Sequence, residues 1–209
     1  MLGRIFLACF ISLALAGCRH SHEVVAPPSA EQPSDAWRSL VTQDDRGRLR
    51  NWRKSFTDAL TQARPAFAAA IASEGALLDP DSGLAGARIP AGEYRCRTIK
   101  LGSQRPGGQA FTAYEPRPCR VSAEGARLHF TILDGPQRPL GAFFPDTSRR
   151  MIFLGTLQLG DESLAYRYGR DRERDMIGLL ERIGEHRWRL VLPAPHFESL
   201  LDVIELVPA

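Results

Sequence analysis

From Gly92 to the C-terminus, apolar and polar residues alternate with a period of two, and this pattern restricts the fold more than any other feature. The alternation is clearest in six segments, at residues 94–98, 128–132, 151–159, 177–183, 188–192 and 200–206. Turns rich in Gly, Pro and Asp separate the segments. Because each strand would have a single apolar face and short connections, we predict a meander of about eight antiparallel strands over residues 90–209, forming a small barrel or a sandwich.

The residues before this region, 35–75, follow the helical period instead. Their apolar side chains recur every three or four positions and would form one stripe on a helix. The stripe consists of Leu49, Trp52, Phe56, Ala59, Leu60 and Ala63. Pro65 disfavours a helical conformation at Arg64, so we expect one helix to end there and a short second helix to span residues 66–73. The predicted fold class is α+β, mainly β, with N-terminal helices followed by the antiparallel strands.

The N-terminus has the layout of a bacterial lipoprotein signal. Arg4 supplies a positive charge, and the apolar core at residues 5–15 is shorter than the roughly 20 residues that span a bilayer. The sequence Leu15-Ala16-Gly17-Cys18 then matches the lipobox, in which the cysteine thiol carries a diacylglycerol. Two alternatives stay open: ordinary signal cleavage one residue earlier, or a cysteine without lipid. We interpret residues 1–17 as the signal peptide and Cys18 as the lipidated residue.

The next residues indicate how the folded part is held. Residues 18–34 contain Pro, Ser and His but almost no large apolar side chain, which predicts a flexible linker. Residue 19 is Arg, whereas Asp there favours retention in the inner membrane of Gram-negative bacteria. We therefore expect an exported protein whose lipid anchors it in the cell envelope, in the outer membrane facing the periplasm. A single globular domain is expected over residues 35–209.

The cysteine count agrees with export. Of four cysteines, Cys9 lies in the signal and Cys18 would carry the lipid, which leaves Cys96 and Cys119 as a pair in an oxidising compartment. We predict a disulfide between them, which would stabilise the fold by about 3 kcal/mol on the chain-entropy model. A metal site is the weaker alternative, because no further His or Cys is nearby in the sequence.

No residue pattern indicates a catalytic site or a resident metal. Ser199, His196 and Asp202 are close in sequence, but no nucleophile-elbow motif surrounds the serine. The segment that begins at Asp79 resembles half of a calcium loop, yet Pro90 occupies the twelfth position, where a bidentate carboxylate is needed. We therefore predict no catalytic residue, no metal and no cofactor.

Charge gives one further candidate surface. The chain has 27 basic and 24 acidic residues, and this near balance, together with the predicted export, argues against nucleic acid as a partner. A basic cluster lies on the predicted helix, formed by Arg46, Arg48, Arg50, Arg53 and Lys54. It is a candidate surface for anionic headgroups or an acidic partner, and a solvated helix face is the alternative.

Several segments resemble a bacterial family catalogued as domain of unknown function 4893, which occurs in exported proteins of sphingomonad-type proteobacteria. The matching text is DDRGRLRNWR, GEYRCRTIKLG, ILDGPQRPLGAFFPD, MIFLGTLQLGDE, YGRDRERDMIGLLERI and RWRLVLPAPHFESLLDVIELVP. The resemblance covers nearly all of residues 35–209 and implies a secreted or lipid-anchored, barrel-like domain without an assigned activity or site. Gly92-Glu93-Tyr94 is also similar to the Gly-x-Trp that opens calycin-type barrels, with Tyr in place of Trp.

These observations favour a non-catalytic envelope lipoprotein that binds another macromolecule, an envelope protein for example. One alternative is a carrier of a small apolar ligand inside a calycin-like barrel, and a second is an enzyme without a recognisable motif. An interior filled with side chains would exclude the carrier. A contiguous exposed apolar or charged patch would favour the binding module.

Overall fold

The alternating segments form the strands of a closed sheet in the computed structural model of the protein, which describes residues 36–209. The predicted signal peptide, Cys18 and the predicted linker lie outside the described residues. The strands are β1 (Gly92–Leu101), β2 (Phe111–Ala113), β3 (Arg117–Glu124), β4 (Arg127–Ile132), β5 (Gln137–Thr147), β6 (Arg150–Leu159), β7 (Asp175–Gly184), β8 (Arg187–Pro193) and β9 (Leu201–Pro208). None of the helices between residues 36 and 209 is long and apolar enough to cross a membrane.

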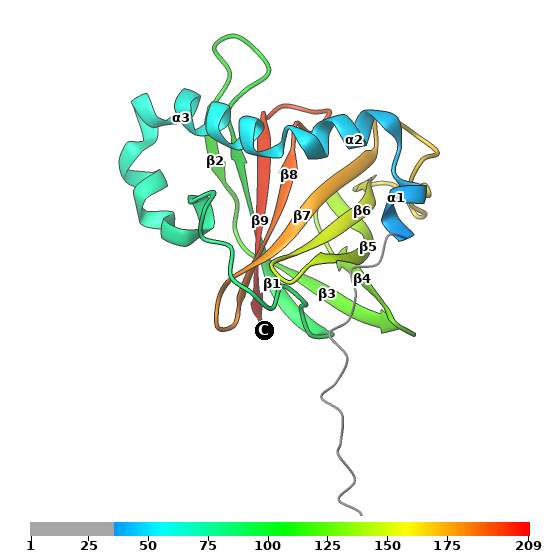
Figure 1. Cartoon of the computed structure of the whole chain (residues 1–209). Helices are drawn as coiled ribbons and strands as arrows, with labels where there is room; N and C mark the ends of the chain where they lie inside the picture. The colour runs from blue at the N-terminus through cyan, green and yellow to red at the C-terminus, as the bar shows by residue number, and fades with distance from the viewer. Residues whose placement is uncertain (1–35) are drawn as a thin grey trace, which may run out of the picture. The chain divides into compact units, whose positions relative to one another are not determined.

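Pairing between β1 and β9 closes the sheet into a barrel of eight antiparallel strands (Figure 1). The short strand β2 is additional: it pairs with the end of β1 at residues 99–101, while β3 pairs with the beginning of β1 at residues 92–96. The predicted fold class is confirmed, and the barrel form of it is the correct one.

The helical residues form α1 (Ala36–Leu40), α2 (Gln43–Arg50), α3 (Trp52–Glu74) and the short 3-10 helix η1 (Gly75–Leu78). The expected break between two helices is present, but it lies at Phe67 and not at Arg64. The helix continues through Pro65, and the two halves of α3 meet at Phe67, whose φ of −129° is not helical. Proline removes one backbone hydrogen bond, but packing keeps the second half in place. The Phe67 ring stacks on Phe111 with centroids 5.6 Å apart, and Ile71 is buried.

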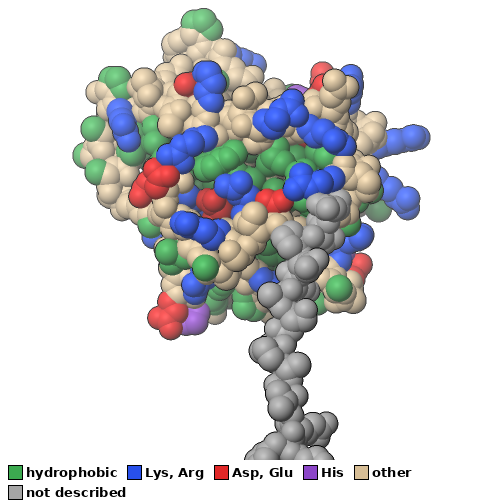
Figure 2. All heavy atoms as spheres, viewed as in Figure 1, with side chains coloured by type: hydrophobic (Ala, Val, Ile, Leu, Met, Phe, Trp, Pro, Cys, Tyr) green, Lys and Arg blue, Asp and Glu red, His purple; other side chains and the backbone are tan. Residues whose placement is uncertain are grey.

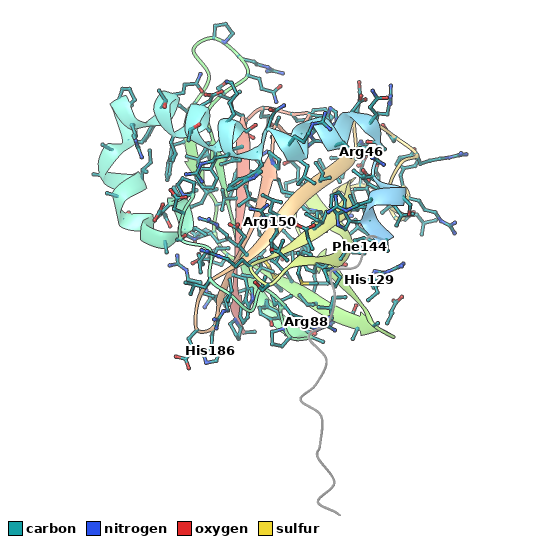
Figure 3. All side chains as sticks on the ribbon, in the orientation of Figure 1. Arg46, Arg88, His129, Phe144, Arg150 and His186 are labelled. Atoms are coloured by element: carbon teal, nitrogen blue, oxygen red, sulfur yellow. A yellow bond between two sulfur atoms is a disulfide. The ribbon has the colours of Figure 1, made fainter. Side chains whose placement is uncertain are left out.

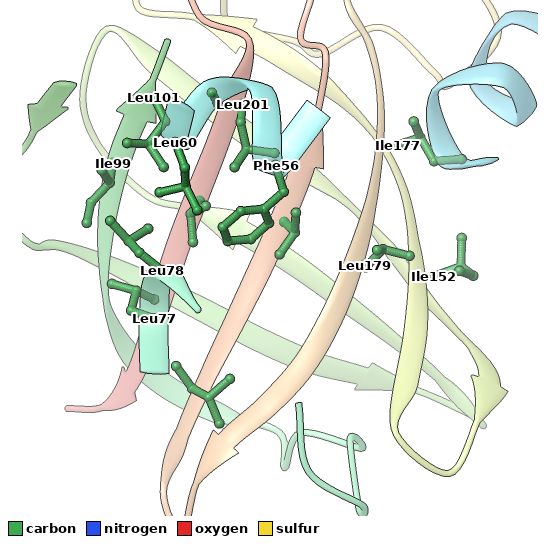
Figure 4. Close-up of a cluster of buried hydrophobic side chains, with 14 of the residues drawn as sticks. Phe56, Leu60, Leu77, Leu78, Ile99, Leu101, Ile152, Ile177, Leu179 and Leu201 are labelled. Carbon is green, nitrogen blue, oxygen red and sulfur yellow. The ribbon is translucent and has the colours of Figure 1, made fainter. Parts of the chain in front are cut away.

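Two hydrophobic cores lie on opposite sides of the sheet. One fills the barrel, and the other lies between the outer face of the barrel and the helices. Figure 4 shows the outer core, where Phe56 and Leu60 of α3 lie near Leu201 of β9. The expectation of one apolar face per strand is therefore wrong for β7, whose residues 175–181 are all buried. Helices cover the outer face of this strand, so both of its faces exclude water.

Candidate binding site at the open end of the barrel

The two ends of the barrel differ in their connections. At one end, short turns join β3 to β4, β5 to β6 and β7 to β8, and the C-terminus lies there too (Figure 1). At the other end, longer loops span residues 102–110, 133–136, 160–174 and 194–200. We call the first the closed end and the second the open end. Longer loops at one end of a rigid barrel are a common location for binding residues.

Aromatic side chains fill the barrel at its closed end and centre. Phe130, Phe143 and Phe153 pack against one another, with ring centroids between 5.6 and 6.1 Å apart. Tyr94 and Trp188 meet edge to face nearer the closed end, at 6.2 Å. The rings pack directly on one another in this part of the interior, which disfavours a carrier that encloses an apolar molecule there. The carrier stays a prediction.

The open end is hollow. A cavity of about 420 Å³ lies there. Its lining combines inward-facing residues of β1, residues at the ends of β3, β4, β5 and β6, and residues of the surrounding loops. These are Cys96, Thr98, Lys100, Tyr114, Glu115, Arg117, Ile132, Pro136, Gln137, Leu159 and Glu198. A smaller recess of about 50 Å³ adjoins it and shares Thr98, Lys100 and Gln137. The lining mixes apolar residues with polar and charged ones, which suits an amphipathic ligand or a polar side chain of a partner.

Lys100 is one of four charged residues on the wall of this cavity, with Glu115, Arg117 and Glu198. Its Nζ lies 3.0 Å from Glu198 Oε2 and 3.5 Å from Asp202 Oδ2. Burial raises the pKa of Asp202, although Lys100 and the Ser199 hydroxyl, which donates a hydrogen bond to Oδ1, both favour its charged form. Burial works to lower the pKa of Lys100, but the charges of Asp202 and Glu198 outweigh it, so that pKa is raised.

The loop that carries Glu198 is braced in a strained conformation. Glu198 has φ of 68°, a left-handed conformation that is unfavourable for a residue with a Cβ. The Gln104 side chain holds the loop by donating to the carbonyl oxygens of Pro195 at 2.6 Å and Ser199 at 2.8 Å. The Gln104 backbone N–H also donates to the Glu198 carbonyl, at 2.8 Å. This bracing fixes the Glu198 carboxylate beside Lys100.

The five basic residues predicted from the sequence do not form one surface. Arg48 turns toward the barrel, where its guanidinium donates to Asp45 at 2.7 Å and to the Asp175 carbonyl at 3.1 Å. The other four are exposed, namely Arg46, Arg50, Arg53 and Lys54. Two of these are paired with carboxylates, Arg53 with Asp81 at 2.8 Å and Lys54 with Asp58 at 2.5 Å. A role for this helix at a membrane or partner stays a prediction.

Ser199, His196 and Asp202 do not assemble as a catalytic triad. The Ser199 hydroxyl is buried and donates to Asp202, whereas Nε2 of His196 lies 3.3 Å from Nη1 of Arg48. Burial and the charge of Arg48 lower the pKa of His196.

No group of three or more His, Cys, Asp or Glu side chains within residues 36–209 could hold a metal ion. Asp79 instead accepts a hydrogen bond from the Asp81 backbone N–H, at 3.0 Å.

The predicted disulfide is confirmed. Cys96 and Cys119 are bonded inside the barrel, and they link β1 to β3 next to the open-end cavity. The cavity itself was not identified from the sequence. The sequence does contain a signal for it. Tyr94, Cys96, Thr98 and Lys100 are alternate residues and share the inward face of one strand, and the last two are polar.

A family model described as domain of unknown function (DUF4893) matches residues 37–206, from the first helix to the last strand. No curated protein and no solved structure matches the chain. The match confirms the resemblance found in the sequence. The family assignment therefore rests on nearly all of the described residues, and the chain belongs to this family of domains of unknown function.

Proposed function

We propose that this protein is a non-catalytic binding module of the cell envelope that holds another envelope protein against the open end of its barrel. Seven large hydrophobic side chains are exposed among residues 36–209. Five of them surround the open end: Tyr114, Leu133, Leu164, Tyr166 and Phe197. This concentration of apolar side chains on one end of the molecule carries the proposal, because exposed apolar surface of this kind marks interaction sites.

The chemistry of this end suits a protein partner. Tyr, Phe and Arg are enriched at the centre of protein interfaces, and here exposed aromatic side chains accompany Arg117 at the cavity. The cavity of about 420 Å³ would receive a side chain that projects from the partner. The lipobox at Cys18 supports the further proposal that a lipid anchors the module in the envelope.

Site-directed photo-crosslinking in cells tests the proposal. A photoreactive residue at Leu164, which is 83% exposed on an open-end loop, should give one discrete crosslinked protein. The matched control is His186, whose side chain is 75% exposed in a closed-end turn (Figure 3) and should give no such product. Equal products from both positions, or none from Leu164 and Phe197, would contradict the proposal.

A second candidate function is supported by the cavity alone, namely retention of a small amphipathic ligand at the open end. Native mass spectrometry of the full chain released from the envelope distinguishes the two functions. A stoichiometric added mass of a few hundred daltons favours the small ligand, and the mass of the bare, disulfide-bonded chain favours the protein partner.

A further inference from the structure

A second hollow lies on the outer face of the barrel, apart from the open end. It has a volume of about 360 Å³ and lies between the start of α3, the turn at residues 79–83 and the hairpin that joins β5 to β6. Its lining comprises Trp52, Arg53, Pro80, Asp81, Gly83, Thr147, Arg149, Arg150 and Glu181. Figure 2 shows Lys and Arg side chains gathered on this face around hydrophobic atoms, and Figure 3 labels Arg150 in its middle.

Arg150 has donors that the surrounding protein does not use. Its guanidinium lies 5.1 Å from the centroid of the Trp52 ring, which is a cation–π contact that orients the group. The nearest carboxylate oxygen, Oε1 of Glu181, is 3.7 Å from Nη2, too far for a hydrogen bond. Within the described part of the chain, the Arg150 Nε–H has no acceptor. A guanidinium carries five N–H donors. The Nε of Arg150 is buried, so the donors on its two Nη atoms are the ones that a ligand in the hollow could use.

The charge of Glu181 is already compensated from the interior. Arg189 is fully buried and donates to Glu181 Oε2 from Nε at 3.0 Å and from Nη2 at 2.8 Å. In this ion pair the positive charge of Arg189 and the negative charge of Glu181 balance each other. Glu181 therefore leaves the positive charge of Arg150 largely uncompensated.

Two more arginines complete the hollow. Arg149 is fixed by hydrogen bonds from Nε and Nη2 to the Gly83 carbonyl, which is a neutral acceptor. Arg53 pairs with Asp81, but these side chains are 50% and 70% exposed, and an ion pair so open to water is weak and easily exchanged. With Glu181 and Arg189 cancelling, three arginines face Asp81 and also Asp79, whose charge acts on Arg53. This leaves an excess of about one positive charge.

We propose that this hollow binds a phosphate monoester group. Such a group carries close to two negative charges at neutral pH and three acceptor oxygens, which suit a hollow with excess positive charge and three guanidinium groups. Arginine pairs with phosphate in a bidentate geometry, and here Trp52 and Gly83 hold two of the guanidiniums in position before the ligand arrives. A carboxylate has two acceptor oxygens and would engage fewer of these donors. The phosphate comes either from a lipid headgroup or from a soluble phosphorylated molecule.

Calorimetry on the full chain in a non-ionic detergent tests this site. The probes are inorganic phosphate and dihexanoyl phosphatidic acid, with dihexanoyl phosphatidylcholine as the control for partition into detergent. We expect one phosphate group to bind per chain. Arg150→Gln should weaken binding by about ten-fold or more, the usual effect of losing a charge-assisted pair. Arg53→Gln should weaken it less, because Arg53 lies at the exposed rim.

The matched control is Arg120→Gln, which removes an arginine that is 53% exposed and paired with Glu93 elsewhere on the barrel. It should leave binding unchanged. Phosphatidic acid binding at least ten-fold tighter than inorganic phosphate assigns the site to a lipid headgroup, and equal affinities assign it to a soluble phosphomonoester. Absence of binding at millimolar concentrations, or equal binding by wild type and Arg150→Gln with unchanged melting temperature, overturns the proposal. Arg53→Gln keeps the test valid if Arg150→Gln does not fold.

Discussion

Lys100 and Asp202 both line the small recess that adjoins the open-end cavity, where burial and charge act on their pKa values in opposite directions. Burial raises the pKa of Asp202 above its ordinary value of about 3.9. The folded state therefore holds a proton on this carboxyl more tightly than the unfolded state does. It follows that the contribution of Asp202 to stability falls as the pH rises from about 4 through its folded pKa.

Replacing Asp202 by Asn should remove this dependence. We expect the free energy of unfolding of Asp202→Asn to decline less than that of wild type between about pH 4 and pH 7, because the amide does not ionise. Urea denaturation at several pH values measures it. Asp134→Asn is the control, since its side chain is 52% exposed. A slope equal to that of wild type would mean that Asp202 ionises alike in the folded and unfolded states.

For single residues, a role could be predicted from the sequence only where the residue type and its count in the chain leave one choice. The pair Cys96 and Cys119 could be predicted, because only two cysteines remain after the signal and the lipobox. The burial of Arg189 could not be predicted. It stands at a polar position of an alternating strand, where the side chain usually points to solvent. Its burial depends on a helix more than a hundred residues earlier in the chain, and no local pattern contains that information.

Among the elements, β8 and η1 are joined by this one buried arginine. Arg189 donates to Glu181 on β7 and also contacts the carbonyl oxygens of Ala76, Leu77 and Asp79, the last at 2.5 Å. These carbonyls follow the end of α3, where helical partners run out. The arginine thereby attaches the end of the helical region to the outer face of the barrel.

Removing the Arg189 side chain should destabilise the folded protein. Arg189→Met should lower the free energy of unfolding by about 3 to 5 kcal/mol, because the buried Glu181 loses its hydrogen-bonded partner and keeps only Arg150, at 3.7 Å, and because the carbonyls lose their donor. Chemical denaturation followed by tryptophan fluorescence measures the loss. The double variant Arg189→Met with Glu181→Gln should regain part of it, and a double variant no more stable than the single one would contradict this explanation.

The helices show why element boundaries were harder to predict than element types. The stripe of apolar residues that includes Phe56 and Leu60 does face the barrel. Pro65, however, lies inside α3, because packing of Phe67 and Ile71 outweighs one lost hydrogen bond. The open-end cavity escaped prediction for a related reason: it forms where several strands end together, and only the closed barrel brings those ends into one place.

For the molecule as a whole, the bend of the barrel depends on one pair of glycines. Gly141 of β5 and Gly155 of β6 are cross-strand partners. A methyl group on either would overlap the backbone of the opposing strand and the Phe153 ring. Glycines at such positions let neighbouring strands approach and curve, which closure of a small barrel requires.

A methyl group at this position should therefore destabilise the barrel. Gly155→Ala should lower the free energy of unfolding by about 3 kcal/mol, at the upper end of the usual cost of overpacking. Gly47→Ala is the control, since Gly47 lies in α2 with nothing within 4 Å of an added methyl group, and should be stabilised by about 0.5 to 1 kcal/mol. Thermal unfolding followed by circular dichroism compares the two, and equal melting temperatures would contradict the role of this glycine pair.

The closure of β1 by β9 also makes one pairing late in folding. The strands that complete the barrel come from opposite ends of the β region, so the entropy of a long loop must be overcome before their contacts form. A chain in which β9 is not yet in place can pair its other strands in sequence, but it cannot form a barrel. Until β9 has paired, the edges of β1 and β8 remain available to pair with strands of other chains.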